Sequence, residues 1–80
     1  MYYVYILKSE NFSKQTYIGF TKDLRKRLKA HNDGGNPHTS KFRPWQLIFY
    51  SAFENKDRAL EFERYLKTHS GKAFATKHLI

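Results

Sequence analysis

The 80-residue sequence predicts an α+β fold, in which a small, mainly antiparallel three-stranded sheet is flanked by helices. Three short segments are rich in β-branched and aromatic residues, and the first two are separated by only seven, mostly polar residues. Two later segments carry apolar residues at helical spacing. The predicted order is β-β-α-β-α with a short last helix over 72–80, and residues 1–80 are expected to form one domain.

The predicted strands cover residues 2–8, 16–20 and 45–53. The first reads YYVYILK, with apolar residues at both alternating sets of positions, which is typical of a strand covered on both faces. The short turn-like segment 9–15 predicts an antiparallel hairpin between the first two strands. Gly19 lies inside the second strand, where a glycine costs stability unless something approaches the backbone closely.

The first predicted helix runs over residues 22–31, with Thr21 as its N-cap and the segment NDGG as its end. Asp23 then lies in the first turn, where the helix dipole favours an acid. On a helical wheel, Arg27 and His31 fall beside the two leucines of the apolar stripe rather than on the solvent side. The stripe that faces the sheet is therefore bordered by an arginine and a histidine.

The second predicted helix covers residues 56–69, with Asn55 as its N-cap and residues 70–71 as its end. Its two glutamates lie on opposite sides of the wheel. With Ala59 of the apolar stripe at 0°, Glu61 falls at about 200° and faces water, whereas Glu63 falls at about 40° and points toward the sheet. Only Glu63 therefore has an unusual position for a charged residue.

Taken alone, each of these inward-pointing groups can be explained by a purely structural role. The stem of Arg27 can cover apolar surface, and Glu63 can pair with Lys67 at i,i+4. Taken together, three polar groups point toward one sheet, and charges near a core are costly unless they are paired or used. This coincidence favours a functional site, because the same sheet also carries Tyr3, Tyr5 and Tyr17.

Composition favours a polyanionic partner and excludes several kinds of site. The 15 Lys and Arg residues outnumber the 7 Asp and Glu residues and give a net charge of +8. This charge predicts binding to nucleic acid, and the alternative is a basic surface without a binding function. Because the chain has no cysteine, disulfides and thiolate metal sites are excluded. The longest apolar run, residues 2–7, is too short to cross a membrane and no signal peptide is visible, so the expected location is the cytoplasm.

Several segments, in this order and spacing, resemble the GIY-YIG nuclease superfamily. Residues 4–6 (VYI) and 17–19 (YIG) resemble the paired tripeptides that name the superfamily. The segments TKDLRKRLKAHN, KFRPWQLIFYS and EFERYLK are similar to its first helix, third strand and glutamate helix. The closest resemblance is to small stand-alone bacterial proteins that are similar to the nuclease domain of the bacterial repair excinuclease.

The resemblance implies a DNA endonuclease that hydrolyses phosphodiester bonds with one divalent ion, Mg²⁺ or Mn²⁺, in DNA repair or recombination. The implied catalytic residues are Tyr5 and Tyr17, one of which takes the proton from the attacking water, together with Arg27 on the scissile phosphate and His31 nearby. Glu63 matches the single metal ligand.

The resemblance also leads to expectations about the pKa of the catalytic tyrosine, the role of Gly19 and the residues that contact DNA. An ordinary tyrosine titrates near ~10, so nearby positive charge from Arg27, Lys22 or the metal is expected to lower the pKa of the catalytic tyrosine. Gly19 is expected to let the substrate or the metal approach the strand. The residues expected to contact DNA are Lys22, Lys26, Lys41 and Arg43.

The sequence departs from the family pattern at three places. Tyr3 stands where glycine is usual, Phe20 stands where a lysine is frequent, and no asparagine follows Glu63. A second hypothesis therefore stays open, a non-catalytic or weakly catalytic nucleic-acid-binding module on the same fold. A third, a purely structural or interaction protein, is disfavoured because the site residues are all present. Because 80 residues leave no room for an attached DNA-binding domain, a partner protein is one expected source of specificity.

Overall fold

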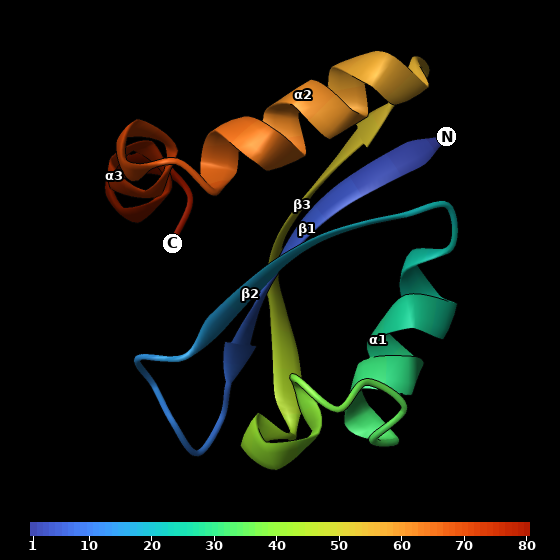
Figure 1. Ribbon diagram of the computed structural model, residues 1–80, viewed down its shortest axis with the longest axis vertical. Helices are drawn as coiled ribbons and strands as arrows, with labels where there is room; N and C mark the ends of the chain where they lie inside the picture. The colour runs from blue at the N-terminus through green and yellow to red at the C-terminus, as the bar shows by residue number, and fades with distance from the viewer.

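The computed structural model describes residues 1–80 and consists of a three-stranded sheet with helices on both of its faces (Figure 1). The α+β class and the element order predicted from the sequence are confirmed, including the last helix. None of the helices is both long and apolar enough to cross a membrane. The elements are β1 (Tyr2–Ser9), β2 (Thr16–Thr21), α1 (Leu24–Asn32), the 3-10 turn η1 (Ser40–Phe42), β3 (Trp45–Phe53), α2 (Lys56–Leu66) and α3 (His69–His78).

The first strand, β1, lies in the middle of the sheet and pairs with antiparallel β2 on one side and antiparallel β3 on the other. Its central residue, Tyr5, is opposite Gly19 of β2 and Tyr50 of β3. The predicted hairpin between the first two strands is confirmed. The central place of β1 explains its sequence, because the four residues from Val4 to Leu7 are each at most 1% exposed.

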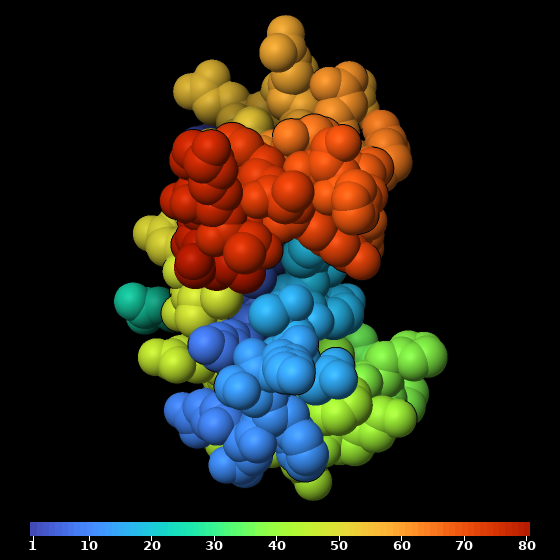
Figure 2. All heavy atoms as spheres, turned by 90° about the vertical axis from the view of Figure 1, so that its left-hand side faces the viewer, coloured from blue at the N-terminus to red at the C-terminus, as the bar shows by residue number.

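Alternate side chains of β1 enter two separate cores on the two faces of the sheet. The first core, under α2 and α3, is formed by Val4, Ile6, Ala59, Leu66 and Ala75. The second core, under α1, is formed by Tyr5, Leu7 and Trp45, with Leu24 and Leu28 packed against it. The helices accordingly lie on opposite sides of the sheet in Figure 1, and Figure 2 shows α2 and α3 together above the β1–β2 hairpin.

The start of α1 differs from the prediction. The N-cap is Asp23, whose side chain accepts a hydrogen bond from the Lys26 N–H at 3.1 Å, so Asp23 is not in the first turn. The predicted cap, Thr21, is still paired with Tyr3 in the sheet, and its hydroxyl accepts from the Asp23 N–H instead. Because strand pairing holds Thr21, the helix begins two residues later than expected.

The predicted end of the second helix at residues 70–71 is wrong. Helix α2 ends at Leu66, and Thr68 caps a new helix, α3, by accepting a hydrogen bond from the Gly71 N–H. Gly71 is buried inside α3, and a Cβ atom there would overlap the backbone of Tyr65. The glycine therefore permits the close crossing of α2 and α3 rather than stopping a helix.

Candidate active site

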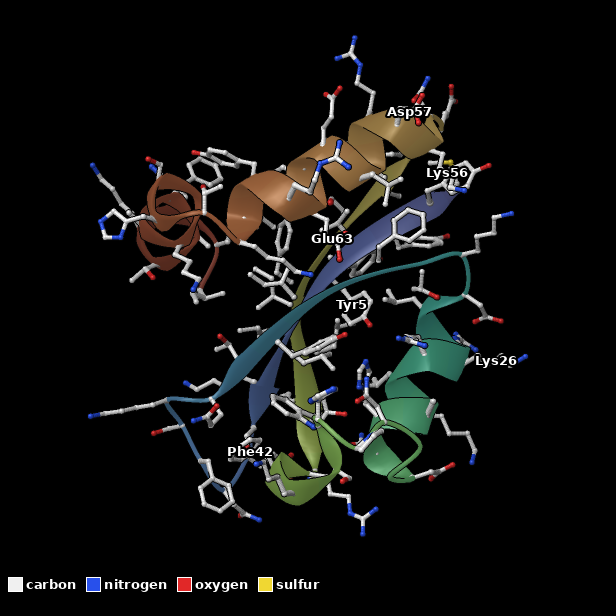
Figure 3. All side chains as sticks on the ribbon, viewed as in Figure 1. Tyr5, Lys26, Phe42, Lys56, Asp57 and Glu63 are labelled. Atoms are coloured by element: carbon white, nitrogen blue, oxygen red, sulfur yellow. The ribbon has the colours of Figure 1, made fainter.

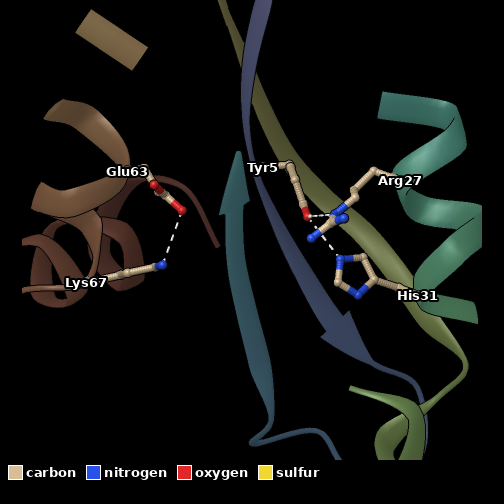
Figure 4. A network of polar contacts seen from close by, with 5 residues as sticks. All are labelled: Tyr5, Arg27, His31, Glu63 and Lys67. Atoms are coloured by element: carbon tan, nitrogen blue, oxygen red, sulfur yellow. Dashed lines mark hydrogen bonds and ion pairs between the residues drawn. The ribbon is translucent and has the colours of Figure 1, made fainter. Parts of the chain in front are cut away.

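A buried tyrosine stands at the centre of the candidate site. Tyr5, in the middle of β1, is 1% exposed, yet its hydroxyl contacts two polar side chains of α1 (Figure 4). The hydroxyl lies 2.9 Å from Nε2 of His31, and Nε of Arg27 donates to it at 3.3 Å. The helix face predicted from the wheel thus brings Arg27 and His31 to the same atom of the sheet.

Gly19 makes room for this tyrosine. It is the β2 partner of Tyr5, and a Cβ atom at this position would overlap the phenol ring and hydroxyl of Tyr5. The group that closely approaches this strand is the Tyr5 side chain, and the expected approach of a substrate or metal to Gly19 stays a prediction. The second tyrosine, Tyr17, lies beside the cluster, with its ring centroid 6.2 Å from that of Tyr5 and 4.7 Å from that of His31.

Thr39 continues the hydrogen-bonded chain beyond His31, and sequence reasoning missed it. Its Oγ1 atom lies 2.9 Å from Nδ1 of His31 and donates to the carbonyl oxygen of Asn36 at 3.4 Å. Thr39 is 2% exposed, and its own carbonyl accepts from the Trp45 indole at 2.8 Å, which fixes the loop before η1 against β3.

The chain of contacts assigns a direction to each hydrogen bond. A threonine hydroxyl has one proton, and we assign it to the carbonyl oxygen of Asn36, which can only accept, so that Oγ1 accepts the Nδ1–H of His31. A neutral His31 then has its lone pair on Nε2, which accepts the proton of Tyr5. The Tyr5 oxygen in turn accepts from Arg27. The cluster therefore forms one directed relay from Tyr5 through His31 to Thr39.

Burial and charge set the protonation states of the cluster. Burial raises the pKa of the Tyr5 hydroxyl above its ordinary value, although its hydrogen bond from Arg27 acts in the opposite direction, so the expectation of a lowered tyrosine pKa is wrong in this structure. Burial, with a smaller effect of the Arg27 charge, lowers the pKa of His31, which favours the neutral imidazole. The hydrogen bond to Tyr5 raises the pKa of Arg27, which stays a cation.

Glu63 stands on the other side of the edge strand. Figure 4 shows Glu63 and Lys67 on one side of β2 and the Tyr5 cluster on the other. The Glu63 side chain is 17% exposed and accepts a hydrogen bond from Nζ of Lys67 at 3.1 Å, whereas Glu61 is exposed. Its negative charge contributes to the raised pKa of Tyr5, so it acts electrostatically on the cluster.

The donor set around Glu63 restricts the kind of metal it could hold. The structure has no group of three or more His, Cys, Asp or Glu side chains that could surround an ion. A single carboxylate fits a hard cation that keeps most of its water and takes further oxygen ligands from a substrate, which is how Mg²⁺ is bound in many phosphate sites. Glu63 therefore fits one such ion.

The four basic residues predicted to bind DNA come from two parts of the chain, the start of α1 and the region of η1. Lys22 lies over the Tyr2 ring at 5.5 Å and Lys41 lies over the Phe42 ring at 5.4 Å. Lys26 points outward from α1 (Figure 3). Lys41 lies within η1, and Arg43 follows η1 directly in the chain. All four side chains are exposed, and their contact with DNA stays a prediction.

Comparison with known proteins gives the same family over almost the whole chain. A model of the GIY-YIG catalytic domain matches residues 1–77. A UPF0213 protein of Clostridium perfringens is 46% identical over 68 residues, which cover 84% of this chain and 71% of that protein. The UPF0213 protein YazA of Bacillus subtilis is 42% identical over 67 residues, covering 82% of this chain and 66% of YazA. A UPF0213 protein of Staphylococcus saprophyticus is 40% identical over 70 residues, covering 86% and 83%.

The family match spans the whole candidate site. The family model covers both tyrosines, the arginine and histidine of α1 and the glutamate of α2. The chain spans 66–83% of the length of the three relatives described above. It therefore belongs to the GIY-YIG catalytic domain family, a family of nucleases, with UPF0213 proteins among its relatives.

Proposed function

We propose that this protein is a metal-dependent DNA endonuclease that hydrolyses phosphodiester bonds. The observation that carries the proposal is the buried Tyr5 hydroxyl, held between a neutral imidazole and a guanidinium. A core tyrosine needs only one partner to satisfy its hydroxyl, whereas this arrangement supplies both a proton acceptor and a cation at one atom. Groups arranged in this way are suited to proton transfer next to an anion.

The raised pKa of Tyr5 defines how it would act as a base. A standing phenolate is disfavoured, so Tyr5 accepts the proton of the attacking water while its own proton passes to Nε2 of His31. The water oxygen forms the new bond to phosphorus, the bond to the leaving oxygen breaks, and that oxygen takes a proton from solvent. His31 remains as an imidazolium, which returns its proton to solvent after the product leaves.

Arg27 has a second role beside its bond to Tyr5. Its Nε atom donates to Tyr5 and its side chain is exposed, so further N–H groups of the same guanidinium can reach a phosphate. A guanidinium binds phosphate oxygens in a bidentate way and stabilises the charge that grows on them in the transition state. Arg27 therefore couples substrate binding to the protonation state of Tyr5.

One Mg²⁺ or Mn²⁺ ion would be held by Glu63, and when bound it would polarise the phosphate. The remaining ligands would be water and the substrate itself, because no group of three or more His, Cys, Asp or Glu side chains is present to complete the coordination. DNA is the proposed partner on the basis of the net charge of +8. DNA repair or recombination is the proposed setting, in the cytoplasm, with a partner protein as a source of specificity.

A second candidate function is a nucleic-acid-binding module with weak catalysis. Two observations favour it, namely the raised pKa of Tyr5 and the ion pair that occupies Glu63 with Lys67. The first feature disfavours deprotonation of Tyr5, and the second occupies the carboxylate that would hold the metal in the absence of DNA. The two functions differ in turnover, so a cleavage assay separates them.

The test compares two glutamates on opposite sides of α2. Cleavage of branched, nicked and plain duplex DNA is measured with Mg²⁺ and with Mn²⁺ for the wild type, Glu63→Gln and Glu61→Gln. We expect Glu63→Gln to lose metal-dependent cleavage and Glu61→Gln, whose side chain is exposed, to retain it. Binding of DNA without cleavage in the wild type would favour the binding module, and loss of activity in Glu61→Gln alone would overturn the site assignment.

A further inference from the structure

The largest pocket of the molecule lies outside the Tyr5 cluster. It has a volume of about 480 Å³ and lies between α1 and β3, with walls that include Tyr3, Tyr50, Leu28, Leu47, Lys22 and Arg25. On the α1 wheel, Arg25 falls at about 100° from Leu24 and Arg27 at about 300°, so the two arginines lie on opposite flanks of the apolar stripe. The pocket is therefore separated from the Tyr5 cluster by the leucines of α1.

One wall of the pocket is an exposed aromatic pair. The rings of Tyr3 and Tyr50 are 6.2 Å apart and tilted by 58°, and Tyr50 is 55% exposed although it lies on a strand of the sheet. Beyond its contact with Tyr3 the Tyr50 ring is open to solvent, and a large aromatic side chain left open beside a pocket offers a flat surface for stacking. The pocket volume lies within the range of small-molecule sites.

The rim of the pocket is basic. Lys22 and Arg25 both line it, and neither takes part in the two ion pairs of the structure; Nζ of Lys22 lies over the Tyr2 ring at 5.5 Å, whereas Arg25 has no such contact. Asp23 also lines it, but its carboxylate accepts the Lys26 N–H at 3.1 Å and is thereby directed to the helix end. An aromatic wall with a cationic rim is complementary to one nucleotide, with its base on the ring and its phosphate on the rim.

We propose that this pocket binds one unpaired nucleobase of a DNA strand, stacked on Tyr50, with the adjacent phosphate at Lys22 and Arg25. The inference rests on the proposed function for the choice of DNA as the ligand. A base that is paired within a duplex presents no free face to the ring, so the pocket selects DNA with an unpaired segment, such as a flap, beside a duplex.

The position of the pocket suits this role. Tyr3 precedes Tyr5 by two residues on the same face of β1, a separation of about 6.8 Å along a strand. The pocket and the Tyr5 cluster therefore lie on the same face of the sheet, close enough for one DNA molecule to reach both.

The test measures DNA binding in EDTA, so that it does not depend on cleavage. The probes are a blunt duplex and the same duplex with a five-nucleotide single-stranded flap, at one fixed salt concentration. We expect the wild type to bind the flapped duplex more tightly, and Tyr50→Ala to weaken flap binding by about fivefold or more while leaving duplex binding unchanged. Tyr50→Phe keeps the ring and should retain flap binding.

The controls separate this inference from the proposed function. Tyr65→Ala removes another exposed aromatic, 41% exposed on α2, and should change neither affinity. If Tyr50→Ala does not fold, Tyr50→Leu keeps an apolar side chain without a stacking face and should show the same selective loss. Equal affinity of the wild type for both probes, or an equal loss on both in the Tyr50 variant, overturns the pocket and leaves the endonuclease proposal standing. Absence of any DNA binding by the wild type overturns both.

Discussion

Replacement of Thr39 by valine should change the tautomer of His31 without a change of charge. Valine has nearly the shape of threonine but lacks the hydroxyl that accepts the Nδ1–H of His31. Without that acceptor, the Nδ1–H tautomer loses its only partner, and the Nε2–H tautomer becomes the favoured form. An imidazole with its proton on Nε2 cannot accept the proton of Tyr5, so the relay is interrupted two side chains away from the substituted residue.

The size of the effect follows from burial. Thr39 and His31 are 2% and 1% exposed, and leaving a buried donor unpaired costs about 1–3 kcal/mol. For a domain of this size, each kcal/mol lowers the melting temperature by about 4–8 °C, so the variant should melt at least about 4 °C below the wild type. Cleavage should fall by about 100-fold or more, because general base catalysis contributes at least that much.

The assay reads the tautomer directly by nitrogen NMR of the imidazole, together with melting temperature and cleavage rate. Thr39→Ser keeps the hydroxyl and should retain the Nδ1–H tautomer and most of the rate, even if it loses some stability. The reasoning is refuted if the wild type carries its proton on Nε2, or if Thr39→Val leaves both the tautomer and the rate unchanged.

Three further predictions concern the same cluster. Gly19→Ala should lower the melting temperature by about 8 °C or more, because the added methyl group displaces Tyr5 and breaks its two hydrogen bonds. Replacing a glycine inside a strand usually has the opposite, stabilising effect. As a control, Gly35→Ala should have a small effect. The protein should lose stability as the pH falls below about 6.5. In that range the histidine at position 31 binds a proton in the unfolded chain, whereas the buried His31 of the folded protein, with its lowered pKa, does not. His31→Gln should therefore flatten the pH dependence of the melting temperature. Arg27→Ala should abolish cleavage but change the melting temperature by only a few degrees, since its exposed side chain makes one hydrogen bond at 3.3 Å.

Each of these predictions has an outcome that contradicts it. A more stable alanine variant at position 19 would show that Tyr5 is not packed on the glycine. A pH dependence that survives in His31→Gln would assign the titration to another group. A large loss of stability with retained cleavage in Arg27→Ala would make the arginine structural.

The sequence predicted the parts of the site that depend on local periodicity. Arg27, His31 and Glu63 were placed correctly relative to the sheet because a helix repeats at a fixed angle, so their faces follow from the neighbouring leucines and alanine. The hairpin follows similarly from two β-prone segments and the short turn between them. These are short-range properties that a single sequence contains.

The parts that could not be predicted depend on contacts distant in the chain. Thr39 is a threonine in a loop, and its bond to His31 depends on the folded position of that loop, to which the hydrogen bond from the indole of Trp45 contributes. Gly71 is a stop signal by local rules, but it is used for a close crossing of two helices. A nearby arginine predicts a lowered pKa for Tyr5, whereas the burial of Tyr5 in the finished sheet has the larger effect.

The two-faced central strand has a consequence for how the site keeps its shape. The proposed phosphate-binding half, on α1, and the proposed metal-binding half, on α2, rest on opposite faces of the sheet, where Val4 and Ile6 of β1 support one layer and Tyr5 supports the other. The distance between the two halves is therefore set by the thickness of a sheet rather than by a hinge or loop. A smaller residue at Val4 would move the carboxylate side toward the sheet while leaving the tyrosine side in place, so the spacing of the two halves can be adjusted from within the core.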